Sequence, residues 1–212
     1  MSISTLILAG RHHPVEGAEL QIRRPTRWPR PTQLDDAGMV FGLYVRVDEH
    51  SGEDGAPAPE IQSIPVRQAL GRWPYLDELP GLVIAVKDDA AWDAWLGNDA
   101  PDLRANRLTF GQWRGRSIDV TWSASWGGLL GRRRQLVFEG PVAFTGIKLY
   151  IYEDESIDTL ISRVWGADAP SRFEIKRLPP VPHRGAPLPE LRDMPAVVGY
   201  DLWPRFLGPR AG

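Results

Sequence analysis

Two carboxylates in the middle of the chain are the residues best spaced for acid–base chemistry. Asp119 and Glu139 lie in consecutive segments of alternating apolar and polar residues, which are joined by the glycine-rich stretch 127–131. A hairpin centred near residues 129–130 would set Asp119 opposite Glu139. Two facing carboxylates raise the pKa of one of them, an arrangement that glycosidases and other acid–base hydrolases use. A hydrolase is therefore one functional hypothesis, and a solvated face neutralised by nearby arginines is its structural alternative.

A second group, near the N-terminus, has residue types that could bind a metal ion. His12, His13 and Glu16 supply two imidazoles and one carboxylate. Adjacent side chains of a strand point to opposite faces, so only a bend at Pro14 would bring all three to one ion. Surface histidines in a loop are the simpler interpretation, and we expect neither a metal nor another cofactor.

The sequence lacks the short motifs that identify the large classes of nucleotide enzymes, hydrolases and zinc proteases. The patterns GxxxxGK[ST], GxGxxG, GxSxG and HExxH do not occur. The chain also has no cysteine, which excludes thiolate catalysis, disulfides and zinc sites with cysteine ligands. Elimination favours a binding protein over an enzyme, and leaves a structural subunit of a larger assembly as a third hypothesis.

Two groups of aromatic and arginine side chains have the composition of a protein interface. The first group surrounds two turns of the predicted central sheet and comprises Trp113, Arg114, Arg116, Arg132 and Arg133. The second group lies in the C-terminal tail and comprises Tyr200, Trp203 and Phe206. We expect these residues to contact another protein or a second copy of the chain.

Charge and composition restrict the class of partner and the compartment. The 212 residues carry a formal net charge of -2, so the sequence does not predict binding to nucleic acid. No stretch approaches the roughly 20 apolar residues that span a bilayer, so no membrane association is expected. The absence of cysteine favours the cytoplasm, and arginine in place of lysine is typical of a bacterial coding bias. By analogy, a toxin-neutralising immunity protein or an accessory protein would fit this profile.

Hydrophobic periodicity predicts an α+β, mainly β fold: an antiparallel β-meander or sandwich-like sheet with two short helices and an extended Pro-rich C-terminal strap. Strands are expected at 3–9, 18–24, 38–48 and throughout a meander at 106–152. A turn at Gly115 would set Phe110 opposite Val120. Most of the nine tryptophans are expected to fill the core.

The two helices are predicted from their capping residues and apolar stripes. The first would lie between Asp88 or Asp89 and Gly97, with Trp92 and Trp95 on one face. The second is expected at 157–165, after an acidic start that suits the positive end of the helix dipole.

A change in composition divides the chain near residue 179. Residues 1–178 are expected to form one globular domain. Residues 179–212 contain many prolines and then several large apolar side chains, which a solvated tail would not normally carry. We expect this tail to pack back on its own domain or on a partner chain.

Overall fold

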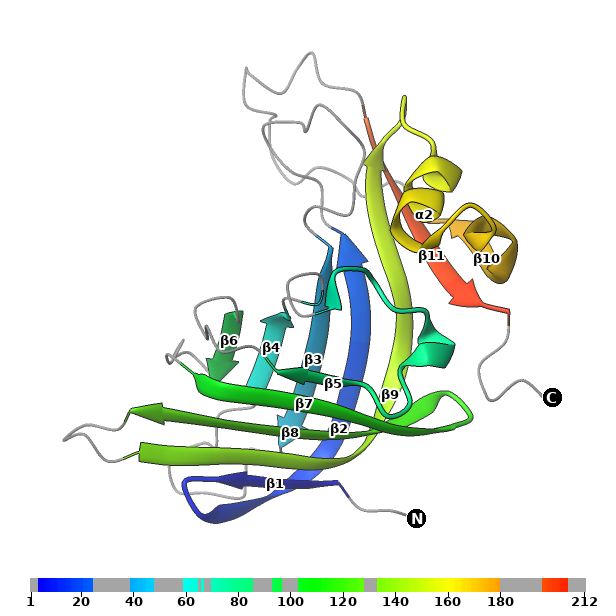
Figure 1. Ribbon diagram of the computed structural model, residues 1–212. Coiled ribbons are helices and arrows are strands. Elements are labelled where there is room, and N and C mark those ends of the chain that lie inside the picture. The colour runs from blue at the N-terminus through cyan, green and yellow to red at the C-terminus, as the bar shows by residue number, and fades with distance from the viewer. Residues whose placement is uncertain are drawn as a thin grey trace, which may run out of the picture. The chain divides into compact units, whose positions relative to one another are not determined.

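A computed structural model confirms the mainly β class (Figure 1). The structure describes the following parts of the chain: 4–24, 39–47, 59–64, 66, 70–85, 93–96, 103–127, 133–179 and 196–205. These parts belong to two compact units. The first is built from Met1–Gln21 and Val40–Thr145, and the second from Gly146–Arg205 together with the end of one strand.

The first unit contains an antiparallel sheet in the order β5-β7-β8-β9-β1-β2-β3-β4-β6. Its strands are β1 (Thr5–Leu8), β2 (Arg11–Arg24), β3 (Val40–Val47), β4 (Pro59–Ser63), β5 (Val83–Ala85), β6 (Asp93–Leu96), β7 (Arg104–Arg114), β8 (Ser117–Gly127) and the first part of β9 (Arg133–Tyr152). Alternation decides which side chains are buried. In β3 the odd positions are buried, namely Phe41, Leu43, Val45 and Val47.

The sheet of the first unit curls around its own core. Strands β3 and β7 are separated in the sheet by β8, β9, β1 and β2. Nevertheless the ring centroids of Phe41 on β3 and Phe110 on β7 lie only 5.5 Å apart. Trp73 stacks on Phe41 at a centroid distance of 6.2 Å, so an aromatic cluster fills the space inside the curl.

The predicted meander is confirmed as β7, β8 and β9. Phe110 pairs with Val120, and the chain turns through Gly115, whose φ of 63° is a conformation that favours glycine. Trp122 is fully buried on β8, and its indole N–H donates to Oδ1 of the buried Asn106 at 3.1 Å. This hydrogen bond pairs two polar groups that are both buried, the indole N–H and the Asn106 amide oxygen.

A short 3-10 turn, η2 (Leu76–Glu78), packs on the meander through the hydrogen bond from Trp113 to the Leu76 carbonyl. Glu78 accepts two hydrogen bonds from the Arg72 guanidinium, at 2.8 and 2.9 Å, and one from the Tyr75 amide at 2.8 Å. The hydrogen bond to Glu78 raises the pKa of Arg72 above its usual value. The hydrogen bonds to Glu78 thereby hold the chain at the point where Leu76 enters the core.

The second unit is centred on the helix α2 (Ile157–Trp165), which confirms the helix predicted at the same residues. Ser156 is the N-cap, and its hydroxyl accepts from the Thr159 amide at 3.3 Å. Four apolar side chains of the helix are buried: Leu160, Ile161, Val164 and Trp165. The Trp165 ring lies 5.3 Å from that of Phe173, which follows the 3-10 turn η4 (Ala169–Arg172).

The aromatic end of the C-terminal tail forms a strand within its own chain. Strand β11 (Val197–Pro204) pairs antiparallel with β9 on one side and with β10 (Phe173–Arg177) on the other (Figure 1). The Pro-rich residues 180–195 and the last residues 206–212 lie outside the described parts, and the domain boundary at residue 178 stays a prediction.

The helix predicted between Asp88 and Gly97 is wrong for residues 93–96, which form strand β6. Residues 59–61 of β4 pair with 94–96, and Ala94 and Leu96 are buried at alternate positions. Leu96 fits a helical stripe and a period of two equally well, so the strand pairing decided between them. Trp92 lies outside the described residues.

Candidate functional site

Trp113, Arg114 and Asp119, all candidate site residues, lie at the hairpin end of β7 and β8. The Trp113 indole N–H donates to the Leu76 carbonyl at 2.9 Å, and its ring meets the edge of Phe144 at a centroid distance of 5.9 Å. Nε and Nη2 of Arg114 both lie 2.9 Å from Oδ2 of Asp119. The polar groups of these side chains therefore bond to partners within the first unit.

The predicted pairing of Asp119 with Glu139 is wrong. Asp119 pairs with Pro141, and Glu139 pairs with Thr121. The two carboxylates are therefore offset by two residues along the strands instead of directly opposite each other. Glu139 is exposed, and Asp119 makes an ion pair with Arg114. The facing carboxylates on which the hydrolase hypothesis depended are therefore absent from this pair of strands.

The loop expected to hold His12 and His13 is also wrong, because these residues belong to a strand. The chain turns at Ala9 and Gly10, and Arg11–Arg24 is one continuous strand in which His12 pairs with Ile7 and His13 with Leu6. A strand places His12 and Glu16 on one face and His13 on the other. Within the described ranges no three His, Asp or Glu side chains lie close enough together to hold a metal ion.

The remaining predicted contact residues lie in different places. Arg116 and Arg133 are exposed at the two ends of β8 and β9, and Tyr200 and Trp203 are half-buried on β11. The Trp203 indole N–H donates to Asp201 at 3.1 Å, which fixes its ring against Gly146. Arg132 and Phe206 lie outside the described residues, so their role stays a prediction.

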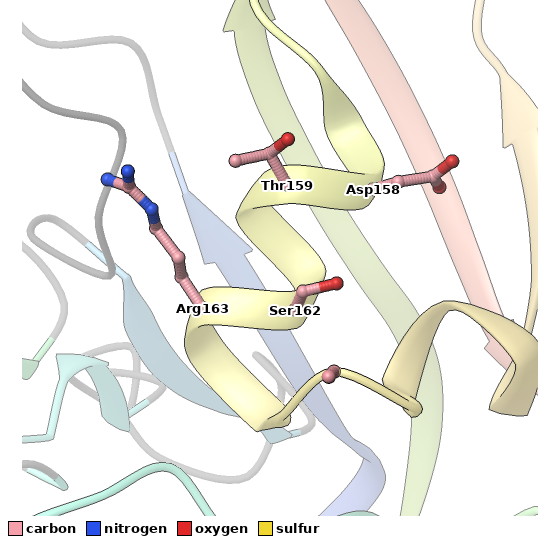
Figure 2. A pocket seen from close by; sticks show the side chains of 5 residues that line it. Asp158, Thr159, Ser162 and Arg163 are labelled. Atoms are coloured by element: carbon pink, nitrogen blue, oxygen red, sulfur yellow. The ribbon is translucent and has the colours of Figure 1, made fainter.

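A hollow of about 350 Å³ lies against the outer surface of α2 (Figure 2). Its lining consists of Asp158, Thr159, Ser162, Arg163 and Ala167. Figure 2 shows Asp158 and Arg163 pointing to opposite sides of the helix. Because their polar ends do not converge, this hollow lacks the arrangement that orients a ligand.

A second hollow, of about 220 Å³, lies on the sheet of the first unit. We call it the groove, and its lining consists of Glu19, Tyr44, Val45, Arg46, Pro59 and Glu60. Strand β2 contributes Glu19, β3 contributes Tyr44 and Arg46, and β4 contributes Glu60 directly opposite Tyr44. Because even positions of β3 point away from the buried side chains, these polar groups meet on the outer face of the sheet.

Two glycines lie beneath side chains that line the groove. A Cβ on Gly42 would lie 2.9 Å from Cε2 and Oη of Tyr44, so the phenol end of that side chain lies over the glycine. A Cβ on Gly17 would lie 3.1 Å from Nη2 of Arg46. The missing side chains thus let Tyr44 and Arg46 lie along the sheet instead of standing out from it.

Charges within the groove are not balanced. Nη2 of Arg46 lies 3.2 Å from Oε1 of Glu19, and both side chains are well exposed, at 67% and 39%. Glu60, by contrast, has no ion-pair partner in the described parts of the chain. The described residues of the lining therefore carry one arginine and two carboxylates, with a formal charge of -1.

Sequence reasoning placed the groove residues of β3 on the correct face but did not select them. The alternation at 40–47 sets Gly42, Tyr44 and Arg46 on the polar side of the strand. Nothing in the sequence says that Glu60 pairs beside them, because the partner of a strand depends on the topology of the sheet. The one local signal for the groove was Gly42, which lies two residues before Tyr44 on the same polar side of the strand.

No helix in the described parts of the chain is long and apolar enough to cross a membrane. Comparison of the chain with known protein families, with curated proteins and with solved structures finds no match.

Proposed function

We propose that this protein is a protein-binding module and that the groove is its main contact surface. The observation that carries the proposal is the grouping of Tyr44, Arg46 and two carboxylates around one hollow on the outer face of the sheet. Tyrosine and arginine are enriched where proteins bind each other, since each offers both apolar area and hydrogen bonds.

The groove is better suited to binding than the residues predicted from the sequence alone. Trp113 and Arg114 already have partners in their own unit. A new contact there would have to replace existing hydrogen bonds. In the groove Arg46 is also paired, with Glu19, but the carboxylate of Glu60 makes no ion pair with a described residue. Arg116 and Arg133, together with Tyr200 and Trp203, remain proposed secondary contacts.

The biological setting remains part of the proposal. A toxin-neutralising immunity protein or an accessory protein of a bacterial cytosolic system would need a binding surface and no catalytic centre. Either role predicts one dedicated partner, and self-association is the alternative.

Affinity capture from the native cells, with the solution mass measured in parallel, tests this function. The wild-type chain should retain one partner in a fixed ratio, or form a defined oligomer. A Tyr44→Ala, Arg46→Ala double variant should lose it. The control, Arg107→Ala with Thr121→Ala, truncates two exposed side chains of the meander and should behave as wild type.

The outcomes separate the possibilities. A monomer that captures nothing would contradict the binding function. An Arg116→Ala, Arg133→Ala variant could lose the partner while the groove variant retains it. This result would support the binding function and assign the contact surface to the ends of β8 and β9.

A further inference from the structure

We propose that the groove receives a cationic side chain, an arginine or lysine, from a segment of the protein partner. This inference rests on the proposed function and specifies the chemistry of the partner. Three features of the groove support it: its charge, its aromatic wall and the glycine beneath the aromatic ring.

The charge of the groove selects a cation. Arg46 is the only cation among the described residues of the lining, and Glu19 already faces it at 3.2 Å. The remaining charge is the carboxylate of Glu60, to which no described residue supplies a counter-ion. An anionic ligand would have to displace Glu19 from Arg46 and approach Glu60, so like-charge repulsion disfavours it.

The aromatic wall stands beside that carboxylate. Tyr44 and Glu60 are directly opposite each other on β3 and β4, where side chains of neighbouring strands are roughly 5 Å apart at Cβ. A guanidinium or ammonium group between them would pair with the carboxylate and lie against the ring, and both interactions favour a cation.

A glycine lies beneath the aromatic ring. The phenol end of Tyr44 lies over Gly42 of its own strand, while Tyr44 and Glu60 both line the hollow. A Cβ at Gly42 would push the phenol end of Tyr44 out of its place. Gly42 therefore acts as a positioning residue for the ring.

Nuclear magnetic resonance titration of the full chain tests the inference with defined probes. The probes are capped tripeptides, glycine–X–glycine, in which X is arginine, lysine or the neutral arginine analogue citrulline. Arginine and lysine should shift the amide signals of Tyr44 and Glu60, with weak, saturable binding. Citrulline, which keeps the shape but not the charge, should bind at least about threefold more weakly.

Two matched variants make the test specific to the groove. Glu60→Gln should weaken the cationic probes by at least about threefold, and Glu139→Gln, the same change at an exposed strand position of the meander, should leave them unchanged. Equal binding of arginine and citrulline, or equal effects of the two variants, would overturn the inference.

Failure of this inference is distinguishable from failure of the binding function. Suppose that the wild-type and Glu60→Gln chains capture a partner equally well, and the Tyr44→Ala, Arg46→Ala variant does not. This result would overturn the inference of a cationic side chain and would still support the protein-binding function. Capture of a partner whose retention falls with Glu60→Gln and with rising salt would support both.

Discussion

The groove and the hairpin end of β7 and β8 are built from the same kinds of residue but use them differently. Each has an aromatic ring, an arginine and a carboxylate on the sheet of the first unit. At the hairpin end the indole N–H of Trp113 bonds to Leu76, and Arg114 pairs one-to-one with Asp119. Among the described residues of the groove there is one carboxylate more than there are cations.

The glycines of the two regions differ in the same way. In the groove, Gly17 and Gly42 are covered by the ends of long side chains, which can move. In the meander, Gly111 lies under Cβ of Asp119, and Gly140 lies against the backbone of Ser4, neither of which can move without the strand. The comparison suggests that a binding surface and a structural surface can be told apart by what covers their glycines.

The largest expected effect is a loss of stability at the glycine of the meander. An alanine Cβ at Gly140, where φ is 153°, would lie 2.5 Å from Cα of Ser4, so the backbone of one strand must shift. We expect Gly140→Ala to lower the free energy of unfolding by about 3 kcal/mol. Gly42→Ala should change it by no more than about 1 kcal/mol, since only the end of Tyr44 must move.

Urea denaturation of the two variants measures this difference directly. Equal losses of stability for Gly140→Ala and Gly42→Ala would show that Tyr44 above Gly42 is held as firmly as the backbone beside Gly140. The contrast between movable and fixed neighbours of the glycines would then be wrong.

The aromatic rings should give the next largest difference. Trp113→Ala removes the contact with Phe144 and the hydrogen bond to Leu76, and should cost about 2 to 3 kcal/mol because the ring is only half-buried. Tyr44→Ala should cost about 1 kcal/mol or less. Thermal or urea unfolding of both variants checks the order, and a larger loss for Tyr44→Ala would mean that this ring is structural.

An intermediate variant separates packing from hydrogen bonding at the hairpin end. Trp113→Phe keeps a ring beside Phe144 and leaves the Leu76 carbonyl without its indole donor, so we expect a loss of about 1 kcal/mol. A loss equal to that of Trp113→Ala would assign the whole effect to the hydrogen bond.

The smallest expected effect concerns the carboxylates themselves. Asp119→Asn weakens an exposed ion pair with Arg114 and should lower stability by about 0.5 kcal/mol, less at high salt. Glu60→Gln should not lower stability, because no described cation pairs with it. Unfolding of both variants at two salt concentrations tests the contrast, and a salt-dependent loss for Glu60→Gln would reveal a hidden partner.

Sequence patterns predicted the elements of the meander better than their register. The face of each strand was correct, because the burial of Val120 and Trp122 follows a period of two. The register between β8 and β9 was wrong by two residues, a shift that keeps every side chain on its own face and so leaves the pattern unchanged. In the observed register Asp119 is not opposite Glu139, so the expected facing pair of carboxylates does not form.

Local capping signals were reliable where tertiary contacts agreed with them. Helix α2 begins after Ser156 and ends at Gly166, as its sequence indicates. The expected helix before Gly97 had similar signals, but pairing with β4 made residues 93–96 a strand. The groove could not be predicted, since it needs β2, β3 and β4 side by side.

The most direct test of the account is the affinity of the captured partner for two charge-reversal variants, measured by titration calorimetry. Glu60→Lys and Glu139→Lys make the same change in net charge on the same sheet, one in the groove and one in the meander. We predict that Glu60→Lys weakens binding by about tenfold or more and that Glu139→Lys changes it by less than about twofold. Equal effects, or a larger effect of Glu139→Lys, would contradict the assignment of the groove as the binding surface.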